Sequence, residues 1–150
     1  MSEQIYYRAG YKYQLAADYE TQLTFAPPNA IHTKFVNFYE NGKLIVYEGY
    51  AWDGPSGPTA DLPYFMRGSL VHDALYGLMQ ADLLNRVNYR NLADLTLVRL
   101  CEEDKMPPAQ VYLTYQGVKL FGDPYATPGN GNPIIKAPGD PVIFTADTRA

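Results

Sequence analysis

The sequence predicts an α+β protein, in which an antiparallel β-meander from the N-terminal half packs on three helices from the C-terminal half. Two observations support this fold class. Short segments that alternate polar and apolar residues fill the first part of the chain, and helical periodicity replaces them in the second part. Strands followed by helices are typical of α+β folds. With 150 residues, the chain is long enough to bury a hydrophobic core.

The expected strands lie between residues 11 and 47. Residues 11–15 and 21–25 alternate, so one face of each strand would be buried. Residues 34–39 and 43–47 flank the pair Asn41-Gly42, which predicts a hairpin because both residues tolerate a positive φ. These segments together give the meander.

Three helices are expected next. The first covers about residues 64–79, with Pro63 at its start, where a missing N–H is tolerated. The second covers about residues 89–103. The third opens at Pro107-Pro108 and ends before Gly122, which is the usual order of proline and glycine in a helix.

The composition changes after Gly122. Residues 123–141 are rich in proline, glycine and asparagine, and a short apolar run follows them. Such a segment buries too little surface to order itself. We therefore expect a single α+β domain over residues 1–122 and an extended tail over residues 123–150. The tail either wraps back on its own domain or docks on a neighbouring subunit, and we favour the neighbour because untethered termini are usually disordered.

Composition and charge exclude several classes of protein. The net charge is −4 and the basic residues are scattered, which argues against nucleic-acid binding. No apolar run reaches the roughly eighteen residues that a transmembrane helix needs. The polar residues 1–4 do not resemble a secretory signal. Cys101 is the single cysteine, which excludes an internal disulfide, and we expect a buried apolar side chain there.

Candidate catalytic residues interrupt two apolar helical patterns. His72 shares one stripe with Leu75 and Tyr76, and Asp94 shares another with Leu97 on the next helix. A buried aspartate that accepts a hydrogen bond from one ring nitrogen of a histidine leaves the other nitrogen available as a base. The alternative is a polar pair that merely fixes the two helices.

A candidate calcium loop precedes the first of these helices. Residues 52–61 contain two glycines and two prolines that could aim several carbonyl oxygens at one point. Oxygen ligands of this kind suit calcium. The candidate ligands are Asp73 and Asp53, with Trp52 and Gly54 contributing backbone carbonyls.

Simpler interpretations exist for each of these residues. Asp73 could be a helix-edge carboxylate, and Asp53-Gly54 a plain turn. Trp52 is expected in the core. Asp61 fits a favourable charge near a helix N-terminus better than a ligand. Ser56 has no base close in sequence, so we do not expect a serine nucleophile.

The stretch from residue 50 to residue 122 resembles a family of phage and prophage proteins classified as a domain of unknown function. The shared pattern is an Asp-Gly-x-Ser loop, a His-Asp-x-x-Tyr helix, an Ala-Asp helix and a closing Phe-Gly. Here these are residues 53–56, 72–76, 93–94 and 121–122. The resemblance implies a phage setting, in the virion or the host cytoplasm, with phage structural proteins or further copies of the chain as partners through the tail.

The chain is also distantly similar to secreted phospholipase A2. That similarity implies that His72 activates a water to attack a lipid or other ester, and that Asp94 orients His72. It further implies that Asp73 binds calcium together with carbonyls around Trp52. Those enzymes usually carry disulfides near the histidine, and this chain has none.

Two functions follow as hypotheses. The first is a calcium-assisted ester hydrolase that uses His72, Asp94 and Asp73. The second is a non-enzymatic phage virion or accessory protein, for example of the tail, connector or capsid. The fourteen tyrosines favour the second hypothesis if they lie on surfaces that become buried in a complex. We favour the alternative, in which the tyrosines cover one half-exposed face of a sheet, because most of them fall in strand-like segments.

Overall fold

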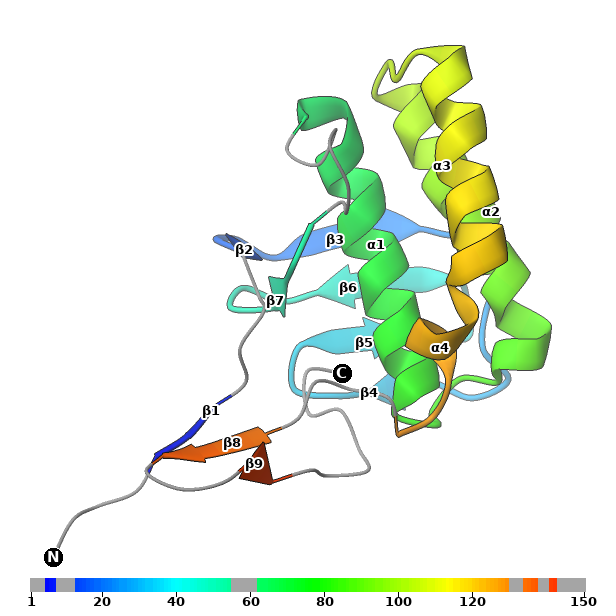
Figure 1. The fold of residues 1–150 in the computed structure, drawn as a ribbon. Coiled ribbons are helices and arrows are strands. Elements are labelled where there is room, and N and C mark those ends of the chain that lie inside the picture. Colours follow the sequence, from blue (N-terminus) through cyan, green and yellow to red (C-terminus); the bar gives the residue numbers. More distant parts are fainter. Residues whose placement is uncertain (1–4, 8–12, 55–61, 130–133, 138–140, 143–150) are drawn as a thin grey trace, which may run out of the picture.

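The computed structural model confirms the α+β fold, with strands in the N-terminal half and packed helices after them (Figure 1). It describes residues 5–7, 13–54, 62–129, 134–137 and 141–142. The strands before the helices are β1 (Ile5–Tyr7), β2 (Tyr13–Gln14), β3 (Tyr19–Gln22), β4 (Ile31–His32), β5 (Val36–Phe38), β6 (Lys43–Val46) and β7 (Ala51–Trp52). The helices are α1 (Pro63–Gln80), α2 (Arg86–Glu103), α3 (Pro108–Phe121) and the short α4 (Asp123–Ala126). Two strands follow, β8 (Ile134–Ala137) and β9 (Pro141–Val142).

The main sheet is antiparallel and has the strand order β3-β6-β5-β4. β2 and β7 form a separate antiparallel pair. The strand expected at residues 21–25 lies slightly earlier, because β3 ends at Gln22. The inner face of β5 and β6 consists of Val36, Phe38, Leu44 and Val46, all fully buried. One face of β5 and β6 is therefore buried in the core.

The expected hairpin joins β5 to β6, but its turn differs from the predicted one. The backbone N–H of Gly42 donates to the carbonyl of Tyr39, and the N–H of Tyr39 donates to Lys43. Only Gly42 has a positive φ, of 88°, whereas Asn41 does not. The longer loop, in which a turn is followed by one left-handed glycine, needs only a single residue of this conformation.

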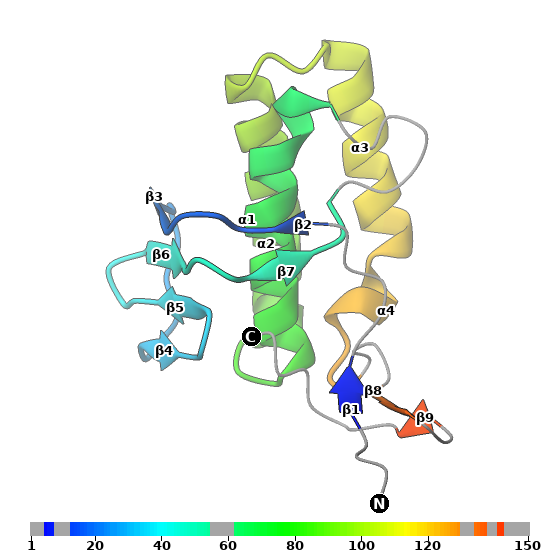
Figure 2. The same ribbon diagram turned by 90° about the vertical axis from the view of Figure 1, so that its left-hand side faces the viewer.

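The helices form layers on one side of the sheet. In Figure 2, α1 and α2 stand between the strands and α3, so α3 lies on the side away from the main sheet. The helix bounds agree closely with the predicted ones, and prolines open α1 and α3 as expected. α2 begins earlier than expected because Asn85 caps it, with its side chain accepting from the N–H of Asn88. No helix among the described residues is long and apolar enough to cross a membrane.

Two clusters of buried side chains hold these layers together. The larger one joins the main sheet to α1, and it includes Trp52, as expected for a core residue. The smaller one joins α1, α2 and the start of α3, and it includes Cys101. Burial raises the pKa of the Cys101 thiol to about 12, so this side chain stays protonated, as expected for a buried apolar residue.

The segment after Gly122 contains more regular structure than the sequence predicted. Asp123–Ala126 forms α4, which contacts the end of α1. β8 pairs with β1 and with β9 in a three-stranded antiparallel sheet, so this part of the tail lies beside the N-terminal segment of its own chain. Docking of the tail on a neighbouring subunit stays a prediction.

Candidate functional site

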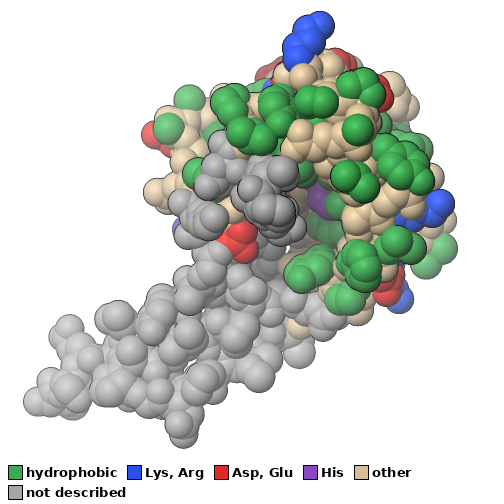
Figure 3. All heavy atoms as spheres, turned by 45° about the horizontal axis from the view of Figure 1, so that its top comes forward, with side chains coloured by type: hydrophobic (Ala, Val, Ile, Leu, Met, Phe, Trp, Pro, Cys, Tyr) green, Lys and Arg blue, Asp and Glu red, His purple; other side chains and the backbone are tan. Residues whose placement is uncertain are grey.

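The site begins with a polar residue on a helix that is buried on most sides. Pro63 starts α1, and the helix then runs beneath the main sheet and against α2. His72 is one of its few partly accessible residues, with 14% of its side chain exposed. Figure 3 shows a histidine set back from the surface, with hydrophobic side chains among its described neighbours. A histidine in such a position can reach both the interior and solvent.

α2 supplies the partner. Asp94 lies on its buried face, next to Ala93, and only 2% of the residue is exposed. A carboxylate this deeply buried is costly unless hydrogen-bond donors surround it. The donors come from α1, which makes more contacts with α2 than any other element does.

The predicted pairing of His72 with Asp94 is present. Nε2 of His72 lies 2.8 Å from Oδ1 of Asp94. Because a carboxylate can only accept, this contact places the imidazole proton on Nε2 and leaves a lone pair on Nδ1. No described residue forms a hydrogen bond with Nδ1. This is the arrangement that a general base needs.

Tyr76 adds a second donor to the same carboxylate oxygen. Its hydroxyl donates to Oδ1 of Asp94 at 2.6 Å, and its ring contacts the His72 ring at a tilt of 35°, with centroids 4.0 Å apart. Burial raises the pKa of the Tyr76 hydroxyl and the bond to Asp94 raises it further, so the hydroxyl keeps its proton. The sequence placed Tyr76 on the stripe of His72 but did not predict this hydrogen bond. Its position four residues after His72 is the signal that could have indicated it.

Arg90 links this cluster to the end of α3, a role that the sequence did not predict. Its Nε donates to the Tyr76 hydroxyl at 3.4 Å, and its Nη2 donates to the carbonyls of Val118 and Lys119, both at 2.9 Å. Arg90 stands one helical turn before Asp94, so the two side chains share one face of α2. Its positive charge lies beside the buried carboxylate and contributes to stabilising it.

The predicted calcium ligands lie on β7, on the residues that follow it and on α1. Asp73 accepts a hydrogen bond from the hydroxyl of the fully buried Tyr50. Trp52 turns its indole inward, and its Nε1 donates to Ser69 at 3.2 Å. Asp53 is exposed, and Gly54 adopts a left-handed φ of 74° against the ring of Tyr13. Glycine therefore suits the turn expected at Asp53-Gly54, because it adopts a positive φ without steric cost.

Side chains alone do not provide a calcium site in the part of the chain that the structure describes. No three His, Cys, Asp or Glu residues there are grouped to hold an ion. A site at Asp73 would therefore depend on backbone carbonyls. Residues 55–61, which include Ser56 and Asp61 and most of the candidate loop, lie outside the described residues.

Comparison of the chain with protein-family models, with curated proteins and with solved structures finds no match. The function therefore has to be inferred from the site itself.

Proposed function

We propose that the protein is a phage-encoded ester hydrolase in which His72 is the general base. One observation supports this most strongly: Nε2 of His72 is held by Asp94, while Nδ1 has no hydrogen bond from any described residue. A histidine that only fixed two helices would not need its second nitrogen open. The phage setting is carried over from the sequence resemblance.

The chemistry follows from this geometry. Nδ1 of His72 removes a proton from a water molecule, whose oxygen attacks the carbonyl carbon of the ester. The imidazolium that forms is stabilised by the Asp94 carboxylate 2.8 Å from Nε2. The tetrahedral intermediate then collapses, the bond to the alcohol oxygen breaks, and Nδ1 returns its proton to that oxygen. Tyr76 and Arg90 act as positioning residues that keep Asp94 in place.

Calcium belongs to this proposal as an extension. Asp73 would hold the ion together with backbone carbonyls near Trp52 and Gly54. When bound, calcium would polarise the ester carbonyl. The test is calorimetric titration of calcium into the wild-type protein and into Asp73→Asn. We expect micromolar to millimolar binding that the variant loses, whereas equal binding by both proteins would remove Asp73 from the site.

The hydrolase is tested with His72→Asn. We expect hydrolysis of p-nitrophenyl butyrate or of phosphatidylcholine micelles, with calcium present, to fall by roughly 100-fold or more, because a general base contributes about 10²–10⁴-fold. The melting temperature should change little, since asparagine can still donate to Asp94. His32→Asn is the matched control, because His32 is exposed on β4. Unchanged turnover in His72→Asn would exclude the proposed role.

A second candidate function is that of a non-enzymatic phage structural or accessory protein, and α3 favours it. Large apolar side chains on this helix are exposed to the extent of 63–72% of their area, namely those of Tyr112, Leu113, Leu120 and Phe121. Lys119 is the only charged residue of α3. Exposed apolar surface of this kind often marks an interface.

This candidate is tested by light scattering on the purified protein. Leu113 and Leu120 lie seven residues apart and share a helix face. We expect the wild-type chain to associate and the double variant Leu113→Glu, Leu120→Glu to be monomeric. A monomeric wild-type protein that also shows hydrolysis dependent on His72 would favour the enzyme alone.

A further inference from the structure

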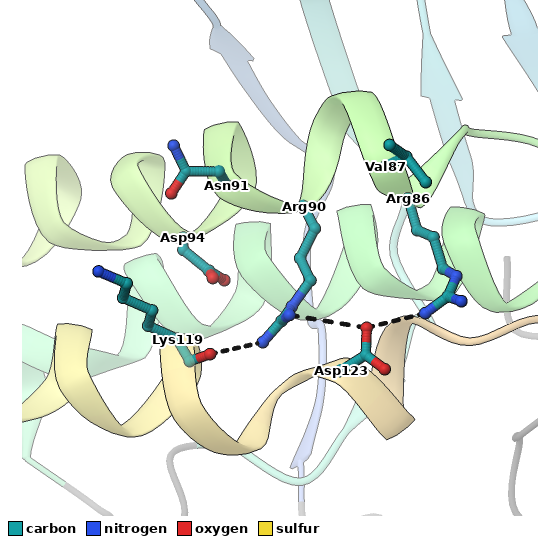
Figure 4. A pocket seen from close by; sticks show the side chains of 7 residues that line it. All are labelled: Arg86, Val87, Arg90, Asn91, Asp94, Lys119 and Asp123. Carbon is teal, nitrogen blue, oxygen red and sulfur yellow. Dashed lines mark hydrogen bonds and ion pairs between the residues drawn. The ribbon is translucent and has the colours of Figure 1, made fainter.

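A second feature of the molecule is a hollow of about 430 Å³ between α2 and the junction of α3 with α4. Figure 4 shows its lining. Lys119 and Asn91 lie at one end, Arg86 and Asp123 at the other, and Arg90 and Asp94 between them. Its volume is within the range of small-molecule sites. The ester hydrolysis proposed above uses Asp94 and Arg90 of this lining, but it gives no role to Arg86, Lys119 or Asp123.

The lining of this hollow is positively charged, although the chain as a whole carries a net charge of −4. Its three cationic side chains, from Arg86, Arg90 and Lys119, exceed its two carboxylates. One of these carboxylates, Asp94, is already held by His72 and Tyr76. The local charge therefore favours an anionic ligand.

Asp123 occupies the position that such an anion would take. Its Oδ1 lies 2.8 Å from Nη1 of Arg86 and 3.6 Å from Nη1 of Arg90. The Asp123 side chain is 55% exposed, and exposed ion pairs of this kind contribute little to stability. An anion with more oxygen atoms and more charge can therefore displace it.

Arg86 and Lys119 also have N–H donors that no described residue uses. Nη1 of Arg86 donates to Asp123 and Thr127, but its Nε and Nη2 have no hydrogen-bond partner among the described residues. The ammonium of Lys119 forms no ion pair within the described part of the chain, and lies 5.8 Å from the centroid of the Tyr115 ring. Arg90 uses its Nε for Tyr76 and its Nη2 for two carbonyls of α3, which leaves its Nη1, 3.6 Å from Asp123, for an anion.

We propose that this hollow binds a small phosphate-bearing molecule, which pairs with Arg86 and Arg90 in place of Asp123 and reaches Lys119 with a second anionic group. A planar guanidinium binds phosphate through two parallel hydrogen bonds, and a lysine ammonium adds a point charge. Figure 4 shows Lys119 and Arg86 toward opposite ends of the hollow, so the probe that we choose is diphosphate, which carries two phosphoryl groups.

The test is calorimetric titration of diphosphate into the wild-type protein and three variants. Arg86→Gln should weaken binding at least tenfold. Asp123→Asn should strengthen binding several-fold, because it removes the internal competitor. Arg99→Gln is the matched control, since Arg99 is also on α2 but pairs with Glu103 outside this hollow. Circular dichroism confirms that each variant is folded.

The titrations either support or overturn the proposed binding of phosphate in this hollow. Saturable binding that Arg86→Gln weakens and Arg99→Gln leaves unchanged supports it. Absence of saturable binding, or equal weakening by Arg86→Gln and Arg99→Gln, overturns it. Weaker binding by Asp123→Asn would overturn exchange with Asp123. Phosphatidylglycerol vesicles, tested in parallel by sedimentation, show whether the phosphate comes from a free molecule or a lipid headgroup.

Discussion

Replacement of Gly122 by alanine tests how tightly the end of α3 is joined to the site. Gly122 follows α3 with a φ of −78°, so its backbone conformation is open to any residue. A Cβ at this position would, however, lie 2.5 Å from the carbonyl oxygen of Val118 and 2.7 Å from the hydroxyl of Tyr76. Glycine is needed here for close approach and not for a left-handed turn.

The expected loss of stability in Gly122→Ala depends on which neighbouring atoms the added Cβ would displace. Displacing a backbone carbonyl or a buried ring costs about 1–3 kcal/mol of overpacking. If the Tyr76 hydroxyl moves, its 2.6 Å bond to Asp94 weakens as well. The smaller entropy of the unfolded alanine chain offsets about 0.4–1 kcal/mol. We therefore expect Gly122→Ala to lower the free energy of unfolding by about 2 kcal/mol and the melting temperature by about 4–8 °C.

Gly117→Ala is the matched control, because the same substitution has the opposite expected effect. Gly117 lies within α3, and a Cβ there would meet no atom within 4 Å. Alanine should stabilise the helix by about 0.5–1 kcal/mol. Both variants are measured by urea unfolding followed by circular dichroism. If Gly122→Ala were as stable as the wild type, or stabilised like Gly117→Ala, the inferred close packing around Gly122 would be wrong.

Two further predictions concern the buried polar groups. Asp94→Asn should lower the free energy of unfolding, measured in urea, by about 2 kcal/mol, because two hydrogen bonds to a carboxylate become bonds to a neutral amide. The control is Asp82→Asn at an exposed position, which should lower it by less than about 0.5 kcal/mol. Equal losses in the two variants would contradict this prediction. Burial raises the pKa of Cys101 from its ordinary 9.0 to about 12, so the stability that the protonated thiol contributes is complete below pH 9 and is lost as the pH rises toward 12. Between pH 8 and 10.5 the free energy of unfolding of the wild type should therefore fall more steeply than that of Cys101→Ala, and parallel slopes would refute this.

Much of the fold could be predicted because local signals and tertiary packing agree. Pro63 and Pro108 open helices where a missing N–H is harmless, and the helical stripes of α1 and α2 correctly place Asp94 in the interior. The hairpin between β5 and β6 was likewise evident from its Asn-Gly pair. Its detailed turn was not, because sequence alone does not indicate whether one residue or two adopt a positive φ.

The candidate site was only partly predictable. The pairing of His72 with Asp94 followed from two matching polar interruptions of apolar helices. The roles of Arg90 and of Gly122 depend on where α3 ends in space, which no periodicity specifies. Pairing of β8 with β1 also joins segments far apart in the sequence. Such long-range pairings leave little local trace in the sequence.

The position of α3 has a consequence for the integrity of the site. Val111 is the only buried side chain that this helix contributes, so α3 has less apolar burial to hold it than α1 or α2 has. Local unfolding is easiest in elements of this kind. If α3 opens, Arg90 loses the two carbonyls that orient it, and water gains access to the Asp94 carboxylate. We therefore expect the opening of this outermost helix to limit the lifetime of the assembled site, even while the sheet and α1 remain folded.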